Sequence, residues 1–194
     1  WKKPLLTGRN RDLSRRTRSH NETLKHLRAD TRLMAEGRLK IVVFGSFNAG
    51  KSSLIQALDP QSRHIEAASS EGPTTVAFDF GRLQVRDQMV YLFGTPGQER
   101  FEFVRQILSR GMDGAIIVVD ATRGVDAMTR HLYAQLKALG VPLAFMANKC
   151  DCPGAMPEAV SQALPGEMVH PISARNGENV HAALDAFITT LIAR

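Results

Sequence analysis

The sequence is poor in the features that mark secreted, metal-chelating or membrane-spanning chains. Its 194 residues include only two cysteines, Cys150 and Cys152, which are too few for a disulfide framework or a cysteine metal set and predict a reducing, cytoplasmic setting. The longest purely aliphatic run, AIIVV at 115–119, is too short to span a bilayer, and no signal-peptide pattern is present. A hydrophobic content of 43% with 23% charged residues is typical of a soluble globular chain.

Acidic residues are scarce at the N-terminal end. Residues 1–40 hold twelve Lys/Arg and four Asp/Glu, a net charge of +8, and the other 154 hold thirteen and fifteen, a net charge of −2, which together give the +6 of the chain. The basic charge therefore belongs to an N-terminal extension, residues 1–38, which precedes a nearly neutral domain at 39–194. Asn21 is placed to cap a helix over 21–36, whereas residues 1–20 are expected to be irregular.

The charge of this extension has two open interpretations. Residues 1–36 either form a solvated helix beside the domain or make a weak, reversible contact with an anionic membrane. The second interpretation would place a cytoplasmic protein peripherally at the inner face of the membrane. Nucleic acid could use the same charge, but no aromatic stacking platform accompanies it, so no nucleic-acid partner is expected.

Residues 39–194 alternate short apolar runs with amphipathic segments. Six strands are expected at 40–45, 75–85, 89–94, 115–120, 143–148 and 167–173, and helices at 52–58, 99–110, 127–139, 157–164 and 180–193. This order predicts an α/β fold with three layers: a six-stranded, mostly parallel sheet with one antiparallel hairpin strand, and helices on both faces. Ligands of such sheets bind beyond the carboxyl ends of the strands.

The first of these strands runs into GSFNAGKS, residues 45–52, which fits G-x-x-x-x-G-K-[ST] between a strand and a helix. In this motif backbone N–H groups surround phosphate oxygens, the lysine charge reaches the β- and γ-phosphates, and the Ser52 hydroxyl is offered to magnesium. The motif favours a P-loop NTPase fold over a glycine-rich turn that binds nothing. The phosphate-binding residues that we predict from it are Gly45, Asn48, Ala49, Gly50, Lys51, Ser52 and Ser53.

Two later strand ends bear on the choice of base. Asp151, in ANKCD, can accept hydrogen bonds from both the N1–H and the 2-amino group of guanine, a pattern that adenine lacks. Lys149 can lie along the base, and Asn148 can tie this loop to the phosphate loop. The PISAR segment completes the predicted base site with Ser173, Ala174 and Arg175. The backbone N–H of Ala174 is expected to meet the guanine oxygen.

Residues from about 40 to 194 resemble a Ras-like small GTPase. The combination of TTVAFDFG with LFGTPGQ is similar to the prokaryotic branch that includes Mgl-type GTPases and relatives paired with Roadblock-domain proteins. The resemblance implies GTP/GDP and Mg²⁺ as cofactors, with Ser52 and Thr75 as metal ligands. Thr75 would also sense the γ-phosphate, with Thr74 as the alternative. Gly97 would donate its N–H to the γ-phosphate, and Gln98 would be the catalytic residue that orients the attacking water.

The strand before TPGQ ends on Gly94, where eukaryotic members of the resembled family carry an aspartate. That aspartate contacts magnesium through a water molecule, so Ser52, Thr75, phosphates and waters can still complete an octahedron without it. Asp79 on the neighbouring hairpin strand is a candidate to supply the missing charge. A purely structural role for Asp79 is equally open.

Two further departures bear on hydrolysis. Phe47 occupies a loop position that is small in Ras-like proteins and that faces the γ-phosphate. The resemblance also implies an arginine just before the switch threonine, as in Mgl-type proteins, but this chain has Thr74 there. The nearest arginines in the two switch segments are Arg63 and Arg100, and each is expected to form a surface salt bridge. We therefore expect slow intrinsic hydrolysis, with charge stabilisation supplied by a partner or by rearrangement of the switch segments.

The sequence thus predicts a GTP-hydrolysing molecular switch that works with Roadblock-type or other GTPase-activating and effector proteins. A nucleotide-locked binding module with negligible turnover is the alternative that Phe47 and Gly94 favour. NKCD argues against a P-loop ATPase or kinase. The resemblance also implies an Arf-like role for the extension, in which its helix is exposed as the nucleotide changes.

Overall fold

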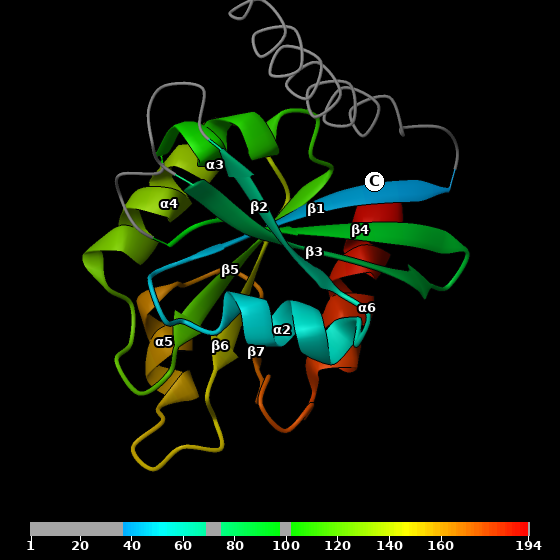
Figure 1. Cartoon of the computed structure of the whole chain (residues 1–194). Coiled ribbons are helices and arrows are strands. Elements are labelled where there is room, and N and C mark those ends of the chain that lie inside the picture. Colours follow the sequence, from blue (N-terminus) through cyan, green and yellow to red (C-terminus); the bar gives the residue numbers. More distant parts are fainter. Residues whose placement is uncertain (1–36, 69–74, 98–101, 194) are drawn as a thin grey trace, which may run out of the picture. The chain divides into compact units, whose positions relative to one another are not determined.

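The computed structural model describes residues 37–68, 75–97 and 102–193 (Figure 1). The expectations for the basic extension, residues 1–36, fall outside these ranges and stay predictions. Within the described ranges, no helix has both the length and the apolar character that a membrane crossing requires.

The elements follow the alternation expected from the sequence. The described strands are β1 (Arg38–Gly45), β2 (Arg63–Ala68), β3 (Thr75–Val85), β4 (Gln88–Gly94), β5 (Gly114–Asp120), β6 (Leu143–Asn148) and β7 (Val169–Pro171). The described helices are α2 (Lys51–Leu58), α3 (Glu102–Ser109), α4 (Ala127–Ala138), α5 (Pro157–Ala163) and α6 (Val180–Ile192).

All seven described strands form one sheet, in the order β2-β3-β4-β1-β5-β6-β7. Strand β3 pairs antiparallel with both of its neighbours, and every other pairing is parallel. The prediction of a mostly parallel sheet with one reversed hairpin strand is therefore confirmed. The sheet has one strand more than the six predicted.

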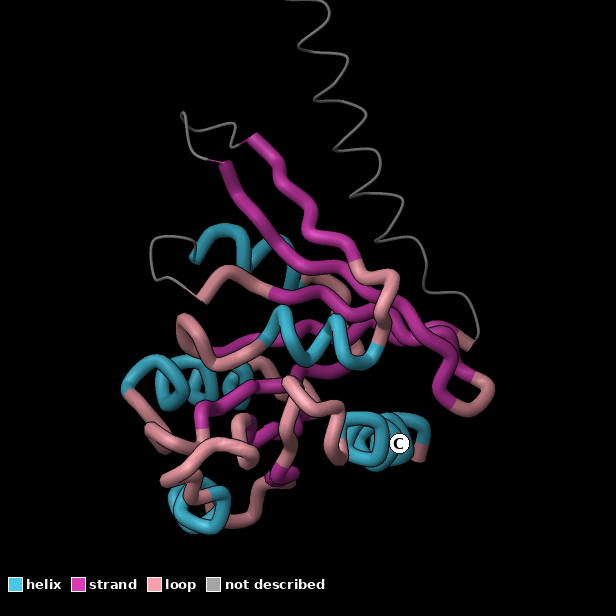
Figure 2. Tube along the Cα trace, turned by 60° about the horizontal axis from the view of Figure 1, so that its bottom comes forward, coloured by secondary structure: helices cyan, strands magenta, loops and turns pink. Residues whose placement is uncertain are grey.

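The additional strand is β2, at the edge of the sheet (Figure 2). Its sequence, RHIEAA, contains a single β-branched residue, Ile65, and shows no clear strand pattern of its own. It pairs with β3 from Arg63↔Phe80 to Ala68↔Thr75. Pairing with the backbone of this long neighbour, rather than local propensity, accounts for the strand.

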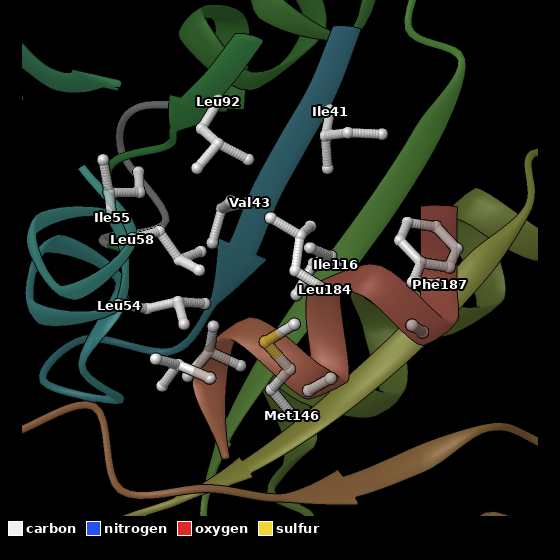
Figure 3. Packing of buried hydrophobic residues seen from close by; sticks show 14 of the residues in the cluster. Ile41, Val43, Leu54, Ile55, Leu58, Leu92, Ile116, Met146, Leu184 and Phe187 are labelled. Carbon is white, nitrogen blue, oxygen red and sulfur yellow. The ribbon is translucent and has the colours of Figure 1, made fainter. Parts of the chain in front are cut away.

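Two hydrophobic clusters attach helices to the two faces of the sheet. Alternate residues of β1 project from opposite faces of the sheet. On one face, Val43 packs in a cluster with Leu54 of α2 and Leu184 of α6, as Figure 3 shows. Val42 joins a second cluster that includes Leu132 of α4. Because the central strands are buried on both faces, their apolar runs are uninterrupted, as parallel strands in α/β proteins require.

The strand register brings the candidate motifs to one edge of the sheet. Gly45, at the end of β1, lies opposite Val118 of β5, and Asp120, at the end of β5, lies opposite Asn148 of β6. The loop after β1 and the loop after β6 are therefore separated only by the end of β5.

Candidate functional site

The loop between β1 and α2 contains two positions that require glycine. Gly45 has a φ of 143°, and a Cβ there would lie 2.4 Å from the backbone oxygen of Val118. Gly50 has a φ of 99°, and its Cβ would lie 2.1 Å from Nδ2 of Asn148. The loop can therefore lie directly against the ends of β5 and β6. Because α2 begins immediately after it, the unpaired N–H groups of the helix start also open onto this loop.

Lys51, the first residue of α2, is a buried cation whose side chain turns back to this loop. Its Nζ donates hydrogen bonds to the backbone oxygens of Gly45 (2.9 Å) and Ser46 (2.7 Å). Burial lowers the pKa of Lys51 to about 8, against the opposing influence of the Asp79 carboxylate. A Cβ on Gly97 would lie 2.7 Å from the Lys51 Nζ. The glycine predicted to contact the γ-phosphate therefore lies directly beside the phosphate-loop lysine.

Asn148 joins the phosphate loop to the loops expected to hold the base. The side chain is buried, with 3% of its surface exposed. Its Nδ2 donates to the backbone oxygen of Ala49 at 2.9 Å, and its Oδ1 accepts from the N–H of Ala174 at 2.9 Å. The predicted tie to the phosphate loop is present. The Ala174 N–H is directed to Asn148 here, so its contact with a guanine oxygen stays a prediction.

Asp151 presents an exposed carboxylate beside this junction. The buried hydroxyl of Ser173 donates to its Oδ1 at 2.7 Å, and this hydrogen bond is the main reason that the pKa of Asp151 lies below its usual value. The carboxylate is therefore ionised at neutral pH and acts only as an acceptor. Oδ1 retains acceptor capacity, because a carboxylate oxygen has two lone pairs.

Lys149 is held in place by a residue that the sequence reasoning missed. Its backbone has a φ of 69°, a left-handed conformation that is rare for lysine and that concentrates at functional sites. Its Nζ donates to Oδ2 of Asp120 at 2.5 Å. Burial disfavours the ionised form of Asp120, but hydrogen bonds from Lys149 and Thr122 outweigh it and lower the pKa of this carboxyl. The position of Asp120 at a strand end was the available signal.

Ser52, the first residue after the lysine, contacts a carboxylate from another strand. Its Oγ donates to Oδ2 of Asp79 at 2.5 Å, and Nδ1 of His64 lies 2.7 Å from Oδ1 of the same carboxylate. Hydroxyl and carboxylate oxygens are ligand types that Mg²⁺ accepts. The residues present therefore fit the predicted metal. Thr75 begins β3, but its side chain lies outside the described part of the structure.

These residues surround one pocket of about 960 Å³. The predicted site residues that line it are Asn48, Gly50, Lys51, Ser52, Ser53, Gly97, Asn148, Lys149, Asp151, Ala174 and Arg175. Three others contact lining residues without lining the pocket themselves: Gly45, Ala49 and Ser173. Gln98 falls outside the described residues, so its catalytic role stays a prediction.

The rim of the pocket has two further features. Phe47 is 60% exposed and belongs to the pocket lining. The neighbouring Ser46 donates its hydroxyl to Asp126 at 2.6 Å, and Asp126 in turn caps α4 by accepting from the N–H of Thr129. The phosphate loop is thus connected to α4, a link between distant residues that no local pattern predicts.

Replacement of Asn148 by alanine should destabilise the whole domain. The N–H of Ala174 and the carbonyl of Ala49 would both lose their buried partner, and each unsatisfied group costs about 1–3 kcal/mol. We expect the melting temperature to fall by about 5–10 °C. Thermal unfolding followed by circular dichroism measures this. Asn176→Ala is the matched control, because Asn176 is exposed on the same edge, and equal melting temperatures for the two variants would contradict the proposed junction.

Comparison with known sequences agrees with this geometry. Residues 36–193 match the family described as the elongation factor Tu GTP binding domain. The chain is 35% identical over 118 residues to the uncharacterised protein MJ1339 of Methanocaldococcus jannaschii, a match that covers 61% of this chain and 74% of that protein. It is 33% identical over 157 residues to translation initiation factor IF-2 of Alkaliphilus oremlandii, covering 75% of this chain but 21% of the factor.

Solved structures share the fold at low sequence identity. Elongation factor SelB of Methanococcus maripaludis, in complex with the GTP analogue GppNHp, superposes with a TM-score of 0.64 at 21% identity, covering 80% of this chain and 34% of SelB. The small GTPase Arl6 of Trypanosoma brucei, with bound GppNp, gives a TM-score of 0.59 at 20% identity, covering 80% of this chain and 98% of Arl6.

The chain therefore spans only part of these two relatives: 21% of the length of the initiation factor and 34% of the length of SelB. The family match, in contrast, covers most of the chain, and the pocket contains the phosphate loop that such a match requires. The protein belongs to the elongation factor Tu GTP binding domain family and is a GTP-binding G domain of the P-loop GTPase superfamily.

Proposed function

We propose that the protein is a molecular switch that binds GTP with Mg²⁺, hydrolyses it slowly and changes the order of its switch segments on hydrolysis. The observation that carries this proposal is the junction at Asn148, which connects the phosphate loop to the base loops within one pocket. A nucleoside triphosphate bound there would have its phosphates at Lys51 and its base at Asp151.

The base contacts follow from donor and acceptor chemistry. The ionised Asp151 offers only acceptors, which match the two adjacent N–H donors of guanine and oppose the acceptor at N1 of adenine. Lys149, held by Asp120 at 2.5 Å, supplies its aliphatic stem beside the pocket. Arg175 and Asn48 also line this pocket.

The metal would be held by the Ser52 hydroxyl, Thr75 and phosphate oxygens. The metal would supply positive charge that offsets the charge developing on the phosphates during phosphoryl transfer. Lys51 supplies the second positive charge to the same phosphates. Gly97, which lies beside Lys51, donates its N–H to the γ-phosphate, and Thr75 senses the same group from β3.

Hydrolysis requires a water molecule in line with the γ-phosphate. Gln98 directly follows Gly97 in sequence and is the residue that orients this water. Among the described residues, Arg175 of the PISAR segment lines the pocket, and Arg105 of α3 donates to the backbone oxygen of the lining residue Pro96. Transition-state charge would be stabilised by a GTPase-activating partner or by rearrangement of the switch segments. A Roadblock-type protein is the partner class implied by the resemblance to the prokaryotic, Ras-like branch, as are effectors that read the switch segments.

A nucleotide-locked binding module is the second candidate function. It is favoured by Phe47, which is 60% exposed in the pocket lining where an activating side chain would have to enter. In either case we place the protein in the cytoplasm, with residues 1–36 as a basic segment that can contact anionic membrane.

Gln98→Leu tests turnover. Leucine cannot hydrogen-bond a water molecule, so single-turnover hydrolysis should slow by at least about tenfold. Affinity for GTP should stay the same, because the side chain acts mainly in the transition state. The measurement is conversion of preloaded GTP to GDP, followed by chromatography.

Gln106→Leu, at an exposed position of α3, is the matched control and should hydrolyse at the wild-type rate. A Gln98→Leu protein that keeps the wild-type rate would remove Gln98 from catalysis. Wild-type protein that binds GTP but leaves it intact would favour the nucleotide-locked module.

A further inference from the structure

Three residues form a row across the strands β2, β3 and β4, which are neighbours in the sheet (Figure 1). The register pairs His64 of β2 with Asp79 of β3, and Asp79 with Gly94 of β4. Directly opposed residues of antiparallel strands project from the same face. That face carries α2, because a Cβ on Gly94 would lie 2.8 Å from Cδ1 of Ile55.

Asp79 is the carboxylate of this row, and both of its oxygens have partners. Oδ2 accepts from the Ser52 hydroxyl at 2.5 Å, and Oδ1 lies 2.7 Å from Nδ1 of His64. The Asp79 side chain is 18% exposed, whereas the His64 side chain is 57% exposed. The carboxylate is therefore held between a solvent-facing imidazole and the hydroxyl that the phosphate-loop motif assigns to the metal.

The space beside Gly94 explains why β4 carries no acid of its own. A Cβ on Gly94 would lie 3.2 Å from the Asp79 Cβ and 3.3 Å from its Oδ2, in addition to crowding Ile55. Acids at both positions would also bring like charges together, which disfavours ionisation of one of them. One carboxylate fits at this point, and the chain carries it on β3.

We propose that Asp79 is the positioning acid of the metal site, placed on β3 opposite the β4 position that lacks one, and that it acts on the cation through Ser52. This inference rests on the proposed Mg²⁺-dependent binding of GTP. A hydroxyl has one proton and two lone pairs. When its proton is donated to Asp79, both lone pairs of Ser52 remain for a cation, and the carboxylate makes that oxygen a stronger ligand. His64 fixes the far oxygen of Asp79.

Asp79→Asn tests the inference, because it keeps the shape of the side chain and removes its charge. The readout is the rate at which the fluorescent analogue mant-GDP leaves the full chain, measured over a range of Mg²⁺ concentrations. The Mg²⁺ concentration that slows release half-maximally should rise by about tenfold or more. Release in EDTA should match the wild type, whereas a merely structural role would accelerate it. Asp87→Asn, an exposed carboxylate in the turn between β3 and β4, is the matched control.

A second test moves the acid from position 79 to position 94, and it does not depend on whether the Asp79→Asn variant folds. The Gly94→Asp variant alone should need more Mg²⁺ than the wild type to slow mant-GDP release, because the new side chain meets Asp79 and Ile55. Gly94→Asp combined with Asp79→Gly places one acid back on β4 and should recover part of the wild-type Mg²⁺ dependence. Recovery in the double variant supports the inference even if Asp79→Asn fails to fold.

The outcomes separate this inference from the proposed function. If the wild type binds no guanine nucleotide at any Mg²⁺ concentration, the proposed function fails first. If the wild type binds guanine nucleotide and the Asp79→Asn variant shows the same Mg²⁺ dependence, the proposed function stands and Asp79 has no role at the metal. The inference would also be overturned if the double variant Gly94→Asp/Asp79→Gly needed as much Mg²⁺ to slow mant-GDP release as the single Gly94→Asp variant.

Discussion

The Asp151→Asn variant is expected to bind GTP at least about 100-fold more weakly than the wild type, because two charge-assisted hydrogen bonds to the base are lost. The amide presents one acceptor and one donor, and its NH₂ group would face the donors of guanine. The same amide suits xanthine, which has an oxygen in place of the 2-amino group. Affinity for xanthosine triphosphate should therefore rise in the variant.

Competition against a fluorescent nucleotide measures both effects in one experiment. Ser173 and Asn148, which hold this loop, are unchanged, so the variant is expected to stay folded and to retain its phosphate contacts. The gain of xanthosine binding is the internal control, since a damaged pocket would lose both nucleotides. An unchanged affinity for GTP would exclude Asp151 from the base site.

The Lys51→Met variant should show effects of opposite sign on binding and on stability. Loss of charge-assisted contacts to two phosphates should weaken GTP binding by at least about 100-fold. The folded-state pKa of about 8 lies below the usual lysine pKa of 10.5, so the charged amine costs stability below pH 8 and the cost fades as pH rises from about 8 to 10.5. Removing it should therefore raise the free energy of unfolding at pH 7 by up to about 3 kcal/mol, since each pKa unit corresponds to about 1.4 kcal/mol.

Chemical denaturation at pH 7 and at pH 10 measures the second effect. The stabilisation by Lys51→Met should be present at pH 7 and small at pH 10. Lys137→Met is the control for binding. Lys137 lies on α4, pairs with Glu167 and does not line the pocket, so this variant should keep the wild-type GTP affinity. Wild-type affinity in the Lys51→Met protein would contradict the assignment of the phosphate loop.

Sequence reasoning predicted the parts of the site that are local. The phosphate loop is a contiguous segment between a strand and a helix, so its spacing alone indicates where Lys51 and Ser52 stand. The Asn148 contact with Ala49 was also predictable, because the carboxyl ends of parallel strands share one edge of the sheet. The number of strands was underestimated because β2 depends on its partner rather than on its own residues.

The contacts that sequence could not predict join residues far apart in the chain. Asp79 meets Ser52 because α2 packs on the face of the sheet from which Asp79 projects, and Asp120 meets Lys149 because β5 and β6 are neighbouring strands. The sequence makes Asp79 a candidate replacement for the missing acid, but its hydroxyl partner and the crowded space at Gly94 depend on the strand register. A structural and a functional aspartate have the same sequence signature on a strand.

The measurement that tests the central claim most directly is the identity of the nucleotide that the protein retains. The purified chain would be incubated with equal amounts of ATP, GTP and Mg²⁺, freed of unbound nucleotide and denatured, and the released nucleotide identified by chromatography. We predict a guanine nucleotide, present as GDP after a long incubation. Retained GTP would support the nucleotide-locked module, and retained adenine nucleotide would contradict the account of the base site.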